Sequence, residues 1–100
     1  MASLSGKRVL GLNAGYQISK HAALALSHAA RRAGWDNGIR ATAVCPGFVA
    51  TDMARNRPEL DAAEITQPED LAQLVVDVLK LPNTASAAEL LVNWRYEAGL

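Results

Sequence analysis

The chain has 100 residues, of which half are apolar and five are aromatic, and its ten basic residues balance ten acidic ones. This length allows one small domain, and the neutral charge without a basic stripe argues against a nucleic-acid partner. The single cysteine excludes an internal disulfide. No apolar run approaches the ~20 residues that span a bilayer, and no signal peptide is recognisable, so we expect a cytoplasmic protein that binds no membrane.

The first elements in chain order are a loop and a long helix. Residues 1–15 contain several glycines and an asparagine, a pattern that predicts the end of a strand followed by a loop. Residues 16–33 are rich in alanine and leucine and predict a helix. Small residues cover nearly every face of this helix, which predicts neighbours on more than one side. Gly34 is expected to cap its C-terminus, and residues 36–38 are expected to form a turn.

A buried strand is predicted next, at residues 39–45, where the sequence alternates and then runs apolar. Pro46 and Gly47 end it. Residues 48–65 predict a long, mostly irregular connection with room for one short helix. Such connections inside a compact domain are often functional.

The last elements are a helix at about 67–81 and a short strand at 89–93. Thr66 and Glu69 match a capping box, and an apolar stripe follows the helix as far as Pro82. A strand, a crossover helix and a second strand of one sheet form a parallel, right-handed unit. The fold class is therefore α/β, the C-terminal portion of a doubly wound, Rossmann-like parallel sheet, in the order helix, strand, loop, helix, strand. Ligands of such sheets bind outside the carboxyl ends of the strands.

Tyr16 and Lys20 form a chemically meaningful pair. Their spacing of four residues puts both side chains on one face of a helix, one turn apart. A nearby cation favours the phenolate form of a tyrosine, which is one way to build a general acid/base for a carbonyl or carbinol group. A serine, Ser3, lies thirteen positions before the tyrosine.

Three segments, in this order and at this spacing, resemble the short-chain dehydrogenase/reductase family. Residues 2–6 (Ala-Ser-Leu-Ser-Gly) are similar to the family's serine segment at the end of a central strand. Tyr16-x-x-x-Lys20, with Ser19 before the lysine, is similar to the family's tyrosine–lysine motif. Residues 39–53 are similar to the following strand and its Pro-Gly turn, and the resemblance extends to the strand-like residues near the C-terminus.

The resemblance implies an oxidoreductase that transfers hydride between NAD or NADP and a carbonyl/alcohol substrate. It implies that Tyr16 donates and accepts the proton, that Lys20 supports it and binds the cofactor ribose, and that Ser3 hydrogen-bonds the substrate oxygen. Residues 53–65 would form the substrate-binding lid. The nicotinamide pocket would be lined by four residues that follow the first strand: Pro46, Gly47, Val49 and Thr51.

One part of the family's pattern has no counterpart. The family opens with a nucleotide-binding half that contains a Gly-rich turn, and neither G-x-x-x-G-x-G nor G-x-G-x-x-G occurs here. We therefore expect residues 1–100 to form a single partial catalytic segment that lacks this half and is inactive alone. The uncovered apolar faces of residues 16–33 and 39–45 predict a homo-oligomer or pairing with a separate nucleotide-binding half. The alternative is a non-catalytic oligomerising domain derived from such an enzyme.

Other conspicuous side chains have structural interpretations. His21 and His28 are two turns apart on one helix with no third ligand nearby, so we expect no metal site. Cys45 is expected to be a small buried hydrophobe, and Trp35 and Trp94 are expected to be packing anchors.

Overall fold

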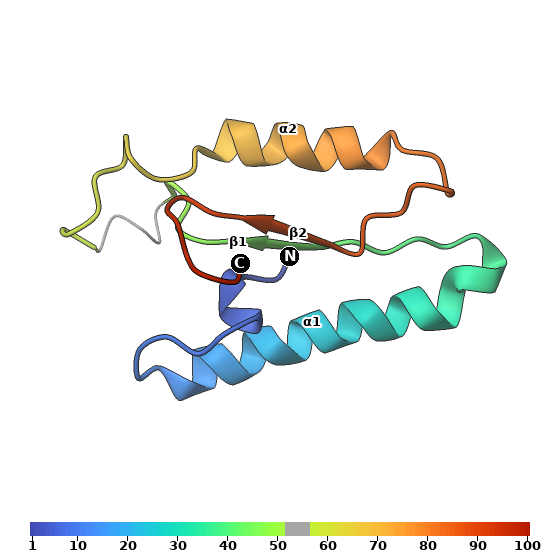
Figure 1. The fold of residues 1–100 in the computed structure, drawn as a ribbon, viewed down its shortest axis with the longest axis horizontal. Coiled ribbons are helices and arrows are strands. Elements are labelled where there is room, and N and C mark those ends of the chain that lie inside the picture. Colours follow the sequence, from blue (N-terminus) through green and yellow to red (C-terminus); the bar gives the residue numbers. More distant parts are fainter. Residues whose placement is uncertain (52–56) are drawn as a thin grey trace.

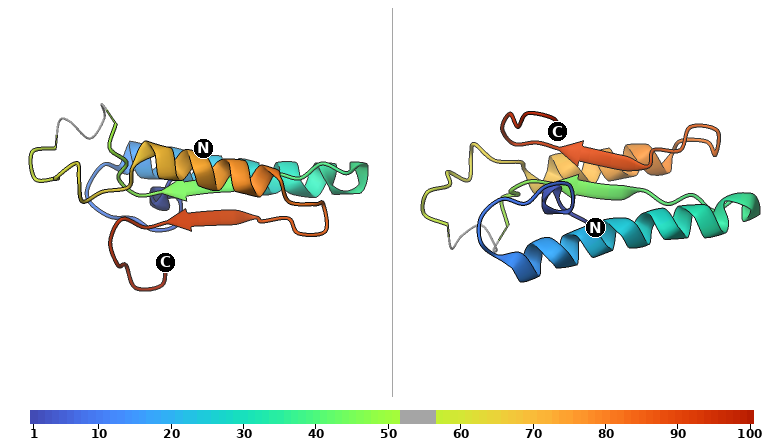
Figure 2. Two further views of the ribbon diagram at one scale, coloured as in Figure 1. Left: turned by 90° about the horizontal axis from the view of Figure 1, so that it is seen from above. Right: turned by 60° about the horizontal axis from the view of Figure 1, so that its bottom comes forward.

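The computed structural model describes residues 1–51 and 57–100, and it has three layers (Figure 1). A two-stranded parallel sheet lies between two helices, and the views in Figure 2 show the same arrangement. The second helix connects the two strands, as the predicted crossover requires. The predicted α/β class and order of elements are confirmed. The elements are, in chain order, the 3-10 helix η1 (Leu4–Gly6), α1 (Ala14–Gly34), the 3-10 helix η2 (Trp35–Asn37), β1 (Ala43–Pro46), α2 (Pro68–Leu79) and β2 (Glu89–Val92).

The N-terminal segment does not form the predicted strand end. Ala2 donates one backbone hydrogen bond to the Val44 oxygen at 2.8 Å, so the segment runs beside β1 for a single pairing. The chain then turns into η1, because the Ser3 hydroxyl oxygen accepts a hydrogen bond from the Ser5 backbone amide at 3.1 Å. A short polar side chain that bonds to the nearby backbone in this way competes with a strand ladder.

Helix α1 begins two residues earlier than predicted, because the Asn13 side chain caps it by accepting from the Tyr16 amide at 3.3 Å. The prediction that Gly34 caps its C-terminus is wrong. Gly34 is the last residue of the helix. A Cβ on Gly34 would lie 2.7 Å from the Ile39 Cβ, so a larger residue at position 34 would clash with Ile39. Gly38, in the predicted turn, takes the left-handed conformation with φ 77°.

The capping box predicted at Thr66 and Glu69 is also wrong. The N-cap of α2 is Gln67, which makes no side-chain cap hydrogen bond. The Thr66 backbone is used instead in an isolated parallel bridge with Val49, which joins the two ends of the connection between β1 and α2. The described parts of that connection, 48–51 and 57–65, contain turns and no helix.

The strands are close to their predicted positions, although β1 is shorter. Pairing starts only at Ala43, opposite Glu89, and ends at Pro46, opposite Val92. The core lies between this sheet and α1. It is formed by buried apolar residues from four segments: Ala2, Leu4, Leu24, Ala43 and Cys45.

Close backbone packing holds η1 against α1. A Cβ on Gly6 would lie 2.7 Å from the backbone oxygen of Lys20, so only glycine permits this approach. Leu4 beside it is almost fully buried, and burying such a side chain stabilises the fold by about 1.5–3 kcal/mol. The contact fixes the segment that carries Ser3 relative to the helix that carries Lys20.

The outer face of α1 is open. Ile18 is 68% exposed and Leu26 is 71% exposed. Within the described residues, α1 therefore has packing neighbours on one side, and the predicted second set of neighbours stays a prediction. None of the helices in the described part of the chain has the length and hydropathy needed to cross a membrane.

Candidate active site

A cavity of about 970 Å³ lies at the carboxyl ends of both strands. The segment after β1, the segment after β2, the N-terminal residues and the first turns of α1 all contribute to its walls. This is the end of the sheet at which open α/β folds bind ligands. All seven residues that the sequence singled out line this one cavity: Ser3, Tyr16, Lys20, Pro46, Gly47, Val49 and Thr51.

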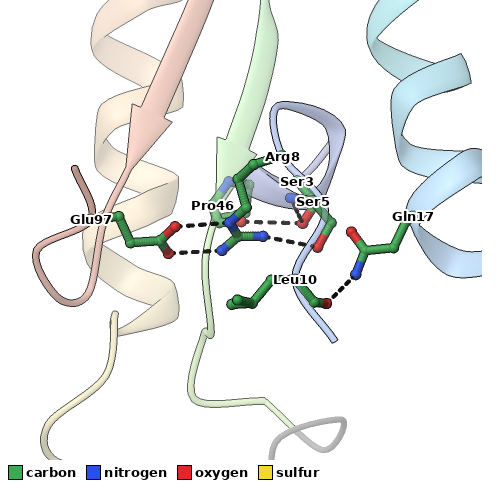
Figure 3. A network of polar contacts seen from close by, with 7 residues as sticks. All are labelled: Ser3, Ser5, Arg8, Leu10, Gln17, Pro46 and Glu97. Atoms are coloured by element: carbon green, nitrogen blue, oxygen red, sulfur yellow. Dashed lines mark hydrogen bonds and ion pairs between the residues drawn. The ribbon is translucent and has the colours of Figure 1, made fainter. Parts of the chain in front are cut away.

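Ser3 is held in one orientation by two polar contacts. Its hydroxyl oxygen accepts from the Ser5 amide at 3.1 Å, and its hydroxyl group donates to the Pro46 carbonyl at 3.5 Å (Figure 3). The second contact joins the N-terminal segment to the end of β1. Because Ser3 is only 8% exposed, its side chain has little freedom to turn away from the cavity.

Tyr16 and Lys20 lie in the first two turns of α1, and both are half-buried. The Lys20 ammonium nitrogen is 5.6 Å from the centroid of the Tyr16 ring. A cation at this distance from an aromatic face is attracted to it, so the contact keeps the two side chains together. The Asn13 cap fixes the start of the helix and therefore the position of Tyr16 in the cavity wall.

The four residues predicted for the nicotinamide pocket line the cavity from Pro46, the last residue of β1, to Thr51. Gly47 is closely covered, because a Cβ there would lie 2.8 Å from the Trp94 Cδ1. Trp94 itself lines the cavity and meets the Phe48 ring edge to face at 6.2 Å between centroids. Thr51 is exposed at the cavity margin.

The predicted lid lies only partly within the described residues. Asp52 of the sequence motif and residues 53–56 of the predicted lid fall outside them. Of the described part of the lid, Arg57, Glu59 and Leu60 line the cavity.

An ion pair that sequence reasoning missed lies in the cavity wall. The Nε and Nη2 atoms of Arg8 donate to the two carboxylate oxygens of Glu97, at 2.8 and 2.7 Å (Figure 3). The Nη1 atom of Arg8 donates to the Ser5 hydroxyl oxygen at 3.4 Å. The bond from Arg8 holds the pKa of Glu97 below its usual value, and the same bond raises the pKa of Arg8. The pair fastens the C-terminal tail to the segment that carries Ser3. Its partners are 89 residues apart, so no local pattern could have revealed it.

A second polar cluster lies away from the cavity. Glu89 contacts Lys7 at 2.9 Å and His28 at 2.6 Å, and it joins β2 to both the N-terminal segment and α1. The hydrogen bond from Lys7, followed by that from His28, lowers the pKa of Glu89. His21 contacts the Gln17 carbonyl oxygen instead. Cys45 is fully buried, and burial raises the pKa of its thiol.

A family model of the short chain dehydrogenases matches residues 1–62, which is more than half of the chain. The chain belongs to the short chain dehydrogenase family. It is therefore a member of a family of oxidoreductases, and the structure confirms the fold that the resemblance implied.

Two relatives with similar sequences are reductases. The chain is 42% identical over 83 residues to an agropine synthesis reductase of Rhizobium rhizogenes, an alignment that covers 83% of this chain and 19% of that protein. It is 32% identical over 98 residues to a ketoacyl reductase of Nostoc, with 93% of this chain and 32% of that protein covered. The chain thus spans well under two thirds of either relative.

Solved structures show the same fold. A beta-ketoacyl-[ACP] reductase from Bacteroides thetaiotaomicron superposes with a TM-score of 0.71 at 32% identity, covering 78% of this chain and 34% of that one. A 4-hydroxyisoleucine dehydrogenase complexed with NADH superposes with a TM-score of 0.78 over 99% of this chain and 45% of that one. At 22% identity the second likeness concerns the fold alone.

Proposed function

We propose that these residues form the proton-transfer half of an NAD(P)-dependent oxidoreductase that interconverts a carbonyl compound and an alcohol. One observation carries the proposal: Ser3, from the N-terminal segment, and Tyr16 and Lys20, from α1, all line a single cavity. The membership of the chain in an oxidoreductase family supports the same chemistry.

Each of the three residues has a distinct part in the proposed reaction. Tyr16 gives its phenolic proton to the substrate oxygen during reduction and takes it back during oxidation. The ammonium group of Lys20 stabilises the phenolate that remains, because opposite charges attract each other more strongly between half-buried side chains than in bulk water. The Ser3 hydroxyl has one proton, which it gives to the Pro46 carbonyl across a long contact of 3.5 Å. We propose that this proton turns to the substrate oxygen when substrate binds, while the hydrogen bond from the Ser5 amide holds the Ser3 oxygen in place.

The cavity would hold the nicotinamide end of the cofactor. Pro46, Gly47, Val49 and Thr51 line it, and the Thr51 hydroxyl, whose contact with the Val49 carbonyl is long at 3.4 Å, would turn to polar atoms of the nicotinamide. Lys20, which also lines the cavity, would bind hydroxyl groups of the ribose. When bound, NADH or NADPH supplies the hydride that adds to the carbonyl carbon.

The described residues include no site built for the adenine and diphosphate of a dinucleotide, since no Gly-rich turn opens a helix in this part of the chain. We therefore propose that the 100 residues alone bind the dinucleotide weakly and turn over no substrate. Activity would require a nucleotide-binding half, in the same polypeptide or from a partner. The full-length protein is the product of the longest natural reading frame that contains these residues.

A second candidate function, a non-catalytic oligomerising domain, is favoured by the exposed apolar side chains of α1. Ile18 and Leu26 lie on the face that no described residue covers. This alternative requires a stable oligomer that binds no dinucleotide. A monomer in light scattering at high concentration contradicts it.

The proposal is tested by titrating the full-length protein into NADH and NADPH and by following nicotinamide fluorescence and carbonyl reduction. We expect saturable binding of one dinucleotide, and we expect Lys20→Met to weaken binding and slow turnover. Lys80→Met is the matched control, because Lys80 lies exposed at the end of α2 and does not line the cavity. A full-length protein that binds neither dinucleotide and reduces no carbonyl compound overturns the proposal.

A further inference from the structure

The charged side chains in the cavity wall do not balance. Four cations and two anions line it among the described residues: Arg8, Lys20, Arg57 and Arg95, and Glu59 and Glu97. Arg8 donates to both carboxylate oxygens of Glu97, at 2.8 and 2.7 Å. Arg57 lies 3.5 Å from Glu59. Within residues 1–51 and 57–100, Lys20 and Arg95 are therefore the cavity cations that have no acidic partner.

Arg95 is held at the cavity wall by an aromatic ring. Its guanidinium carbon lies 4.9 Å from the centroid of the Trp94 ring, a distance at which a cation is attracted to an aromatic face. Trp94 is half-buried, and its ring meets Phe48 edge to face and closely covers Gly47. Arg95 itself is exposed, and no described residue accepts a hydrogen bond from its guanidinium group. Its fork of N–H donors is therefore available to a ligand.

A second guanidinium group and a single carboxylate lie near Arg95. The hydrogen bond from Arg8 holds the pKa of Glu97 below its usual value, and the charge of Arg95 acts in the same direction. The charge of Arg95 thus reaches Glu97, although Arg8 already binds both oxygens of that carboxylate (Figure 3). Two cations surround one anion, so one positive charge remains without a counterpart in the described wall. An anionic ligand would balance it.

The place of Arg95 in the chain separates it from the other proposed roles. It lies three residues after Val92, the end of β2, whereas the stretch proposed to hold the nicotinamide follows β1. Lys20, the other cation without an acidic partner, lies over the Tyr16 ring and is assigned to proton transfer and the ribose. A guanidinium group binds a carboxylate or a phosphate through two parallel hydrogen bonds. The two sources of such an anion are the substrate and the phosphates of the dinucleotide.

We propose that Arg95 is a substrate-recognition residue whose guanidinium group binds a carboxylate of the substrate. The substrate class is then carbonyl compounds that carry a carboxylate, the oxo acids, together with the corresponding hydroxy acids. This inference rests on the proposed function, because it concerns the substrate of the same cavity. A bidentate pair of opposite charges is stronger than a neutral hydrogen bond, and it fixes the orientation of the bound molecule.

The test compares oxo acids with their uncharged amides. 4-Oxopentanoate is matched with 4-oxopentanamide, and 5-oxohexanoate with 5-oxohexanamide, so that the charge is removed at two distances from the carbonyl while the size is kept. With full-length protein and its dinucleotide, we expect kcat/KM to favour the acid of at least one pair by about 10-fold or more. Arg95→Gln should reduce that preference to about 2-fold or less by slowing the acid alone. Arg95→Lys, which keeps the charge but not the fork, should keep part of the preference.

Arg32→Gln is the matched control. It removes the same charge from an exposed arginine in the last turn of α1 that does not line the cavity, so the preference should not change. Because Arg95 is exposed, the melting temperature of Arg95→Gln should stay close to that of the wild type. Tryptophan fluorescence gives a binding readout that is independent of turnover, because Trp94 lines the cavity beside Arg95.

The affinity for the dinucleotide identifies the source of the anion. If Arg95→Gln weakens the binding of NADH or NADPH by about 10-fold and leaves the preference for acids unchanged, the anion is a cofactor phosphate and the recognition role is wrong. Equal reduction of acids and amides by the wild type, or a preference that Arg95→Gln keeps, also overturns it while the oxidoreductase stands. If no carbonyl compound is reduced, the proposed function fails, and binding decides: tighter binding of the oxo acids that is lost in Arg95→Gln supports the recognition role, and equal binding overturns it.

Discussion

Replacing Gly6 by alanine tests whether close packing of η1 on α1 positions the proposed site. A Cβ at this position would lie 2.7 Å from the Lys20 backbone oxygen and 3.2 Å from its carbonyl carbon. Carbon and oxygen atoms in contact are normally at least about 3.3 Å apart, so η1 must move from α1 by about 0.6 Å. The obstacle is helical backbone, which cannot rotate aside as a side chain would.

The expected cost follows from this displacement. Overpacking of a well-packed contact lowers the free energy of unfolding by about 1–3 kcal/mol. Ser3 moves with η1 relative to Tyr16 and Lys20, and a misplacement approaching 1 Å in an active site can lower the rate by up to about 10²-fold. We therefore expect Gly6→Ala to lower both stability, measured by urea denaturation, and kcat of the full-length protein.

Gly15→Ala is the matched control. Gly15 lies in the first turn of α1, and a Cβ there would meet no atom within 4 Å. Alanine is favoured over glycine in a helix by roughly 0.5–1 kcal/mol, so this variant should be as stable as the wild type or more stable, with unchanged kcat. If Gly6→Ala is as stable and as active as Gly15→Ala, the argument that this contact positions Ser3 is refuted.

Two further predictions concern the tail and the core. Arg8 holds the pKa of Glu97 below its usual value of 4.5, so the pair stabilises the fold above that pH and its contribution is lost as the pH falls through the lower folded-state pKa. Glu97→Gln should thus lower the free energy of unfolding by about 1 kcal/mol at pH 7 and converge with the wild type in acid; a difference that stays constant with pH would contradict this. Because Cys45 is 0% exposed and burial raises the pKa of its thiol, DTNB should label the native chain at pH 8 far more slowly than the urea-unfolded chain, and equal rates would show that this core is open.

The sequence was sufficient for features that depend on neighbouring residues. The composition of residues 16–33 is enough to predict α1, and the apolar runs at 39–45 and 89–93 are enough to predict two parallel strands. The spacing of Tyr16 and Lys20 predicted that they share a helix face, and the structure places the ammonium group over the ring. Their catalytic roles stay predictions, because geometry alone does not test them.

Features that depend on distant residues could not be predicted. Thr66 matched a local capping pattern, but a bridge to Val49 uses its backbone and the cap does not form. Arg8 and Glu97 meet only because η1 and the C-terminal tail reach the same end of the sheet. That Arg95 has no acidic partner among the described residues becomes visible only when the ion pairs around it are known.

The central claim is that Tyr16 is the acid/base of a carbonyl reduction, and the rate of the Tyr16→Phe variant tests it most directly. Tyr96→Phe is the matched control, since Tyr96 is 89% exposed and does not line the cavity. With full-length protein and its preferred dinucleotide, Tyr16→Phe should lower kcat by about 10²–10⁴-fold while dinucleotide binding persists, and Tyr96→Phe should match the wild type. Equal turnover by the two variants would contradict the account.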